Sequence, residues 1–135
     1  KVILERLAKY GLEVKEYKIL ADEQKVIEFE LVRLCDELRV DIVLTSGGTG
    51  VGPRDVTPEA TANVLEKEVN GITETLRAYG QKRTPLSMLS RGIGGVRGST
   101  VIINLPGSVR AVTESLDSLF PGILHIFRML EGHSH

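Results

Sequence analysis

The sequence lacks the features that mark several classes of protein. Its single cysteine, Cys35, excludes an internal disulfide framework and fits a reducing cytoplasm. Tryptophan is absent and aromatic residues make up 4%, which argues against stacking platforms for single-stranded nucleic acid. With 17 Lys and Arg against 18 Asp and Glu, no basic face for nucleic acid or a membrane surface is indicated. No apolar run approaches the ~20 residues that span a membrane.

The apolar residues that are present predict one α/β domain over residues 1–135. A chain of 135 residues is long enough for one domain with a real core. Helical stripes alternate with short apolar runs, so we expect a three-layer sandwich with a mostly parallel central sheet. The expected strands are 12–20, 41–45 and 100–105. The expected helices are 1–10, 22–38, 58–70, 72–79, 84–89, 108–119 and 121–130, before a frayed tail at 131–135.

The most informative stretch is residues 43–59, where an apolar strand leads into a glycine-rich loop, a charged turn and a helix. Gly47, Gly48, Gly50 and Gly52 allow positive φ angles and a close approach to a ligand. This loop is longer than the ~2–6 residues of an ordinary strand-to-helix connection. Ligand contact is therefore the favoured interpretation. The alternative is a plain connection that carries a surface Arg-Asp pair.

Three polar features follow the predicted strands and are expected at one rim of the sheet, where open α/β folds bind ligands. They are Asp22, the loop 46–55 and the turn 106–108. Ser108 also begins a helix, where free backbone N–H groups favour a phosphate. Asp22 and Asp55 together offer the hard oxygen ligands that suit Mg²⁺. The simpler alternatives are helix capping for Asp22 and for Ser108.

Other binding motifs are missing or weak. Residues 47–50 lack the Gly-Lys-Ser/Thr that completes a P-loop, and no dinucleotide fingerprint or zinc spacing occurs. The glycines of 92–98 form a strand or a loop. The basic residues around them either face an anionic ligand or are scattered surface charge; they are Lys82, Arg83, Arg91 and Arg97. Cys35 is expected in the core, and His133 and His135 in a frayed end rather than a metal site.

Five segments together resemble the molybdenum-cofactor biosynthesis family, which includes MogA, MoaB and the G domain of gephyrin. The similar segments, which cover nearly the whole chain in order, are Thr45–Gly50, Pro53–Glu59, Leu89–Arg91, Val96–Thr100 and Ile103–Ser108. The resemblance implies a MogA-like fold and a molybdopterin adenylyltransferase. In this reaction the terminal phosphate of molybdopterin attacks the α-phosphorus of Mg-ATP, which gives adenylylated molybdopterin and pyrophosphate.

The resemblance also implies roles for single residues. Asp55 matches the essential aspartate of the family, and Asp22 resembles its acidic partner, both with Mg²⁺ as the metal. The implied substrate-binding residues are Thr45, Ser46, Gly47, Gly48, Thr49, Gly50, Ser90, Pro106, Gly107 and Ser108. Family proteins are usually trimers, so a homotrimer or hexamer in the cytoplasm is expected, with no nucleic-acid or membrane partner.

Two further functions stay open from the sequence. The domain could hold molybdopterin as a trimeric scaffold without turnover. It could instead be a CinA-like nucleotide pyrophosphatase, although the Pro53–Asp55 run argues against that branch. The sequence also departs from the family pattern, because it opens inside the expected first helix, without the apolar first strand of the family. Either the sequence is truncated there or that segment is absent. That missing strand would contribute to the sheet and to the site.

Overall fold

The computed structural model describes residues 2–132 and shows a four-stranded sheet with the strand order β1-β4-β3-β2. The strands are β1 (Ile42–Ser46), β2 (Lys67–Glu68), β3 (Gly94–Arg97) and β4 (Thr100–Leu105). The α-helices are α1 (Val2–Lys9), α2 (Gln24–Val32), α3 (Thr57–Val64), α4 (Asn70–Gln81), α5 (Val109–Leu119) and α6 (Ile126–Leu130). Three short helices complete the fold: the π-helix η1 (Arg33–Glu37) and the 3₁₀-helices η2 (Pro85–Leu89) and η3 (Gly122–His125).

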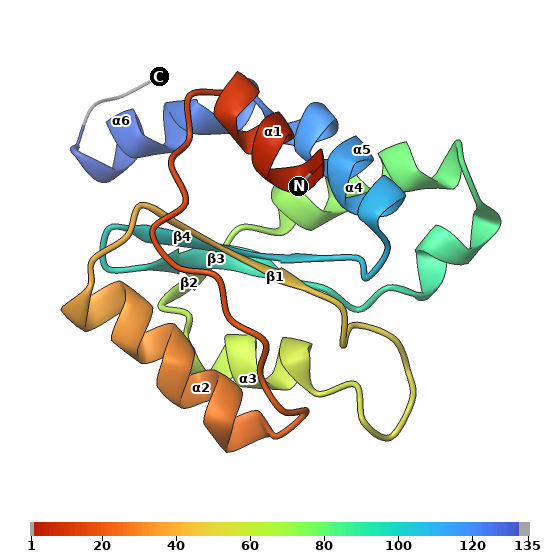
Figure 1. The fold of residues 1–135 in the computed structure, drawn as a ribbon, viewed down its shortest axis with the longest axis horizontal. Helices are drawn as coiled ribbons and strands as arrows, with labels where there is room; N and C mark the ends of the chain where they lie inside the picture. Colours follow the sequence, from red (N-terminus) through yellow and green to blue (C-terminus); the bar gives the residue numbers. More distant parts are fainter. Residues whose placement is uncertain (1, 133–135) are drawn as a thin grey trace.

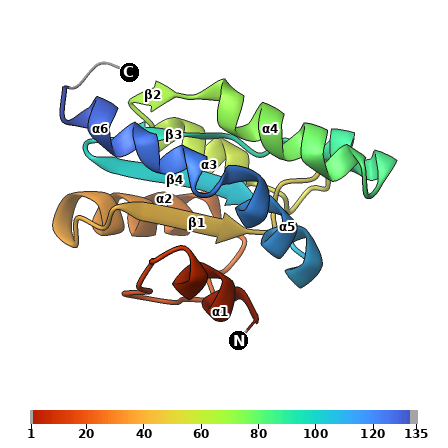
Figure 2. The same ribbon diagram turned by 90° about the horizontal axis from the view of Figure 1, so that it is seen from above.

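The helices cover both faces of the sheet, so the predicted three-layer α/β sandwich is confirmed. Figure 1 shows α2 and α3 on one face and α1, α4, α5 and α6 on the other. Figure 2, turned by 90°, shows α1 beside the β1 edge of the sheet. Among residues 2–132, no helix is long and apolar enough to cross a membrane.

The sheet is mixed, and the expectation of a mostly parallel sheet is wrong. Only β1 and β4 are parallel, whereas β4–β3 and β3–β2 are antiparallel. The reason lies in the turn Gly98-Ser99, which joins β3 directly to β4, with Gly98 at a φ of 59°. A two-residue turn can join only antiparallel strands, because parallel ones need a long crossover. The glycine cluster 92–98 therefore contributes a strand.

Residues 12–20 do not form the expected strand. This segment has no regular secondary structure, and Figure 1 shows it crossing from the layer of α1 to that of α2. Its apolar side chains Tyr17 and Ile19 are 80% and 88% exposed. Ion pairs hold the segment to α2 and η1, with Arg33 2.6 Å from Glu16. Within residues 2–132 no strand pairs with it, so its imperfect alternation of apolar residues yields no ladder.

The predicted helix 58–70 is shorter than expected, because a strand interrupts it. α3 ends at Val64, and β2 follows before α4 begins at Asn70. The backbone N–H of Glu66 donates to Val96, and that of Val69 donates to Gly94, both on β3. These N–H groups thus donate to the edge of β3, whereas in a continuing helix they would donate to carbonyls of the same helix.

The core has two parts, one on each face of β4, and all six residues of that strand are buried. On one face β4 packs against α1, α4 and α5, with Leu116 fully buried. On the other face Ile102 packs against α2 and α3. Cys35 is buried in this second part, which confirms its predicted place in the core. β4 is therefore the central strand of the core, and the turn 106–108 directly follows it.

Asp117 links α5 to helix α1. This contact predicts a contribution to the free energy of unfolding that is lost in acid. Arg6 pairs with the Asp117 carboxylate, and the Tyr10 hydroxyl donates to it at 2.5 Å. The hydrogen bond from Arg6 is the main cause that holds the pKa of Asp117 below its ordinary value, with that from Tyr10 second. A lowered folded-state pKa gives stability that is present above the ordinary pKa of ~3.9 and is lost as pH falls below it.

We expect Asp117→Asn to lower the free energy of unfolding by about 1 kcal/mol at pH 7, because a third of the carboxylate is exposed to screening solvent. The difference from the wild type should shrink as the pH falls below 4. Urea unfolding at a series of pH values measures it. A difference that stays constant down to pH 2 would contradict the role of the ionised carboxylate.

Candidate functional site

Two turns meet at the carboxyl ends of β1 and β4. These strands are parallel neighbours in the register Ser46↔Leu105, so the turns that follow them leave the sheet side by side. The backbone N–H of Gly47 donates to Leu105 at 3.0 Å, and the Ser46 hydroxyl donates to the Pro106 carbonyl at 3.0 Å. A Cβ on Gly47 would lie 3.8 Å from the Cα of Gly107. The two glycine turns predicted to share a rim are therefore in contact.

The glycine loop next passes over the start of α3. Gly48 has a φ of 71°, and a Cβ there would lie 2.4 Å from the Thr57 hydroxyl oxygen. The Thr57 amide donates to the Gly48 carbonyl at 3.2 Å. Thr57 has a residue type that is common at N-caps, but it is the first helical residue, and no side chain caps α3 from Val56. Pro58 lies in the first turn of the helix.

The carboxylate of Asp55 folds back onto the glycine loop. Its Oδ2 accepts a hydrogen bond from the Gly52 amide at 2.9 Å. A Cβ on Gly50 or Gly52 would lie only 2.9 or 3.0 Å from that oxygen, so glycine at both positions makes room for it. Within residues 2–132 nothing donates to Oδ1, so half of this partly buried carboxylate is open to a ligand.

Arg91 holds the same loop from the other side. Its Nε donates to the Gly50 carbonyl and its Nη2 to the Asp55 carbonyl, each at 2.7 Å. Its Nη1 pairs with Glu59 at 2.5 Å, and its backbone N–H donates to Thr49 at 2.7 Å. The hydrogen bond with Glu59 raises the pKa of the guanidinium and lowers the pKa of the Glu59 carboxyl. Arg91 therefore binds the glycine loop and is not one of the scattered surface charges.

Ser90 and Thr49 meet between the loop and α4. Thr49 is buried, and the Ser90 hydroxyl lies 3.5 Å from its oxygen. The Gly92 amide donates to the Ser90 hydroxyl at 3.3 Å, and Arg77 donates to the carbonyls of Ser90 and Gly92. A shallow surface depression opens here. Its lining comprises Thr73, Leu76, Arg77, Ser87, Ser90, Gly92, Asn104 and Pro106.

Asn104 ties the strands of the site together, and the sequence analysis did not single it out. Its side chain, 3% exposed, donates to Thr45 at 2.9 Å and to Thr61 at 3.0 Å. Its Oδ1 accepts from the Ile93 amide at 3.0 Å. The only signal in the sequence was a carboxamide inside an otherwise apolar strand. A buried amide of this kind needs all of its partners.

Asp22 lies at the turn into α2, on the exposed surface. It does not cap that helix as the simpler alternative proposed, because Glu23 occupies the N-cap without a side-chain hydrogen bond. Figure 1 shows the start of α2 and the loop after β1 toward the same end of the sheet. No hydrogen bond joins Asp22 to Asp55 among residues 2–132, so the pairing of these carboxylates stays a prediction.

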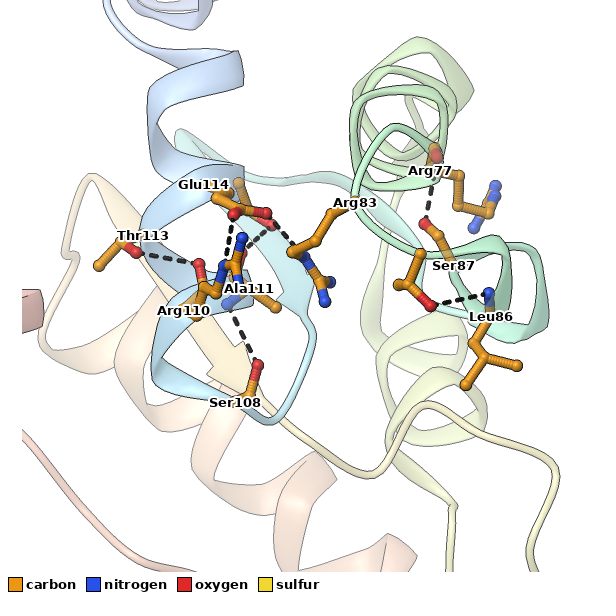
Figure 3. A network of polar contacts seen from close by, with 11 residues as sticks. Arg77, Arg83, Leu86, Ser87, Ser108, Arg110, Ala111, Thr113 and Glu114 are labelled. Atoms are coloured by element: carbon orange, nitrogen blue, oxygen red, sulfur yellow. Dashed lines mark hydrogen bonds and ion pairs between the residues drawn. The ribbon is translucent and has the colours of Figure 1, made fainter.

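Ser108 is the N-cap of α5, as one of its two interpretations proposed. Its oxygen accepts from the Ala111 amide at 3.1 Å, which Figure 3 shows at the start of the helix. A phosphate role for Ser108 stays a prediction. The neighbouring Arg83 is paired with Glu114 at 2.7 Å, and Arg97 is paired with Asp36 at 2.8 Å. These two arginines serve as links between elements.

Metal-binding groups are sparse in the described part of the chain. No cluster of three or more His, Cys, Asp or Glu side chains that could hold a metal occurs there. A cation at this rim would therefore rely on one or two carboxylates and on oxygens of a ligand, which is the usual mode for Mg²⁺. The predicted frayed end with His133 and His135 lies outside the described residues.

Comparisons with known proteins agree on one family. Residues 1–125 match the family described as "Probable molybdopterin binding domain". The chain is 42% identical over 135 residues to the molybdopterin adenylyltransferase of Helicobacter pylori, which covers 98% of this chain and 77% of that protein.

Two solved structures have nearly the same fold. The molybdopterin biosynthesis enzyme MoaB from Thermus thermophilus is 43% identical with a TM-score of 0.89, over 98% of this chain and 83% of that one. The molybdopterin biosynthesis Mog protein from Mycobacterium ulcerans is 39% identical with a TM-score of 0.89, over 98% of this chain and 85% of that one.

Proposed function

Since this chain belongs to the molybdopterin-binding family of molybdenum cofactor biosynthesis, we propose that it transfers the adenylyl group of ATP to molybdopterin. The relative from Helicobacter pylori carries the name of that activity at 42% identity over almost the whole chain. The products are adenylylated molybdopterin and pyrophosphate. The structural observation that carries the proposal is the Asp55 carboxylate, which is set into a glycine loop beside the turn 106–108.

The arrangement suits nucleotidyl transfer, which depends on positioning and charge neutralisation more than on a nucleophilic side chain. The two adjoining turns place the exposed residues Ser46, Gly107 and Ser108 beside the half-buried Gly47 and Gly48, and the glycines let phosphate oxygens approach the backbone. The start of α5 adds the positive end of a helix dipole, which attracts phosphate groups. We assign the hydroxyl groups of Thr45, Ser46, Thr49, Ser90 and Ser108 to substrate binding.

Mg²⁺ fits the donor set at this rim. Among residues 2–132 no ion pair or hydrogen bond occupies the Oδ1 of Asp55 or the exposed carboxylate of Asp22, and both groups are hard oxygen ligands. We assign both residues to the metal, which when bound would offset the charge of the triphosphate and of the departing pyrophosphate. The protein itself orients the two substrates, so that the terminal phosphate of molybdopterin faces the α-phosphorus.

For assembly and location we propose a homotrimer or a hexamer that works in the cytoplasm on the small-molecule substrates ATP and molybdopterin. The similarity to the family supports this proposal. Size-exclusion chromatography with light scattering gives the subunit number directly. A mass corresponding to one chain of 14.8 kDa would contradict the trimer and the hexamer.

A pyrophosphate-release assay tests the activity. With ATP, Mg²⁺ and molybdopterin, we expect pyrophosphate and adenylylated molybdopterin in equal amounts, and no pyrophosphate when molybdopterin is left out. Binding of molybdopterin without pyrophosphate release would support the scaffold function instead. Cleavage of ADP-ribose would support the CinA-like pyrophosphatase. Omitting Mg²⁺ or adding EDTA should stop the reaction.

A further inference from the structure

Residues 50–55, which end in Asp55, have little packing to hold them. Val51 is 77% exposed, and residues 52–54 are also exposed. The internal hydrogen bonds of the segment are local, since the Asp55 amide donates to Gly52 and the Gly52 amide donates back to the Asp55 carboxylate. A segment of this kind opens easily unless another element holds it.

Arg91 supplies that hold. Among the described residues, the hydrogen bonds that join the backbone of 50–55 to another element come from the Arg91 guanidinium. The planar group bridges the carbonyls of Gly50 and Asp55, the first and last residues of the segment. Glu59 fixes the remaining nitrogen from the first turn of α3. The amide of Arg91 adds a bond to Thr49, directly before the segment.

We infer that Arg91 is a positioning residue for the adenylyl-transfer site: its guanidinium closes residues 50–55 into the one conformation that aims the Asp55 carboxylate at its ligand. This inference rests on the proposed function. Arg91 does not touch the substrates in this scheme and acts only through the loop. The planar guanidinium is essential, because an ammonium group cannot donate to two carbonyls and a carboxylate in fixed directions.

The chain contains a matched control in Arg97. Its Nε and Nη2 donate to Asp36, and its Nη1 donates to the Val64 carbonyl at 2.9 Å. Arg97 thus joins a carboxylate and a backbone carbonyl as Arg91 does. It lies at the β3–β4 turn, away from the carboxyl ends of β1 and β4. Arg91→Lys and Arg97→Lys therefore remove the same chemistry from two places.

The test compares the two variants in the full-length chain. Arg91→Lys should lower kcat for adenylylation about 10–100-fold, the usual cost of losing an outer support of a metal ligand, with the KM for molybdopterin unchanged. Hydrogen exchange followed by mass spectrometry should show faster exchange in residues 49–55 of Arg91→Lys only. Arg97→Lys should retain wild-type kcat and wild-type exchange in that loop. Thermal unfolding of both variants verifies that they are folded.

Two outcomes would overturn the inference. The first is an Arg91→Lys variant that matches Arg97→Lys in kcat. The second is a loss of kcat without faster exchange in residues 49–55, because a positioning role requires the loop to open. Arg91→Gln, which also lacks the guanidinium, must show the same loss of kcat and the same faster exchange as Arg91→Lys. Asp55→Asn separates this inference from the proposed function: an inactive Asp55→Asn beside a fully active Arg91→Lys refutes the role of Arg91 alone.

Discussion

Replacement of Asp55 by Asn is expected to reduce the kcat for pyrophosphate release by roughly 10²–10³-fold, a loss typical of removing a group that stabilises transition-state charge. Asn keeps the shape of the side chain and can still accept the hydrogen bond from the Gly52 amide. What it removes is the negative charge, which in the proposed scheme binds Mg²⁺. The loop should therefore stay folded while the chemistry is lost.

The measurement combines kinetics with binding. Pyrophosphate release should collapse in Asp55→Asn, whereas the Kd for molybdopterin, followed by its fluorescence, should stay near the wild-type value. Asp41→Asn is the matched control, because Asp41 is an exposed aspartate directly before β1, at the opposite end of that strand. It should behave as the wild type. Turnover that survives in Asp55→Asn would refute the metal role assigned to Asp55.

The second large effect concerns stability, through Asn104. Asn104→Leu keeps the branching and the number of heavy atoms of the side chain but removes three hydrogen bonds, to Thr45, to Thr61 and from the Ile93 amide. Each buried polar group left without a partner costs about 1–3 kcal/mol. We expect the free energy of unfolding to fall by about 4 kcal/mol, a large share of the ~5–15 kcal/mol available to a domain.

Urea unfolding measures this loss. Asn63→Leu is the matched control, because Asn63 is an exposed carboxamide that donates to Glu28 at 2.8 Å on the surface. Its replacement should cost less than about 1 kcal/mol, since Gln24 and Lys25 still donate to Glu28. An Asn104→Leu variant as stable as Asn63→Leu would mean that Thr45 and Thr61 find other partners. The network would then not be needed to hold β1, β4 and α3 together.

Local signals in the sequence succeeded where a few neighbouring residues determine the structure. The short helix expected at 84–89 is η2, with Thr84 at its N-cap, and Ser108 caps α5 as its residue type predicted. The apolar runs at 42–44 and 101–103 became the neighbouring parallel strands β1 and β4. Because parallel neighbours end at the same rim, the meeting of the two glycine turns could be predicted as well.

Predictions failed where a partner distant in the sequence decided the outcome. The alternation in 12–20 was compatible with a strand, but no strand in residues 2–132 pairs with it. The helix expected to run to residue 70 ended early, because the edge of β3 binds the backbone of 66–69. Propensity and periodicity act over a few residues, whereas a ladder depends on which strands become neighbours.

The sequence by itself determined the α/β class, the family, and the glycine loop with its aspartate, because each depends on residue types at short spacing. Only the tertiary structure decided the mixed sheet and the contacts of Arg91 and Asn104. Arg91 is 36 residues from the Asp55 carbonyl that it binds, and Asn104 is 59 residues from Thr45. Such contacts depend on strand register and on the packing of α3 against β4, and neither follows from the residues adjacent to Arg91 or Asn104 in the chain.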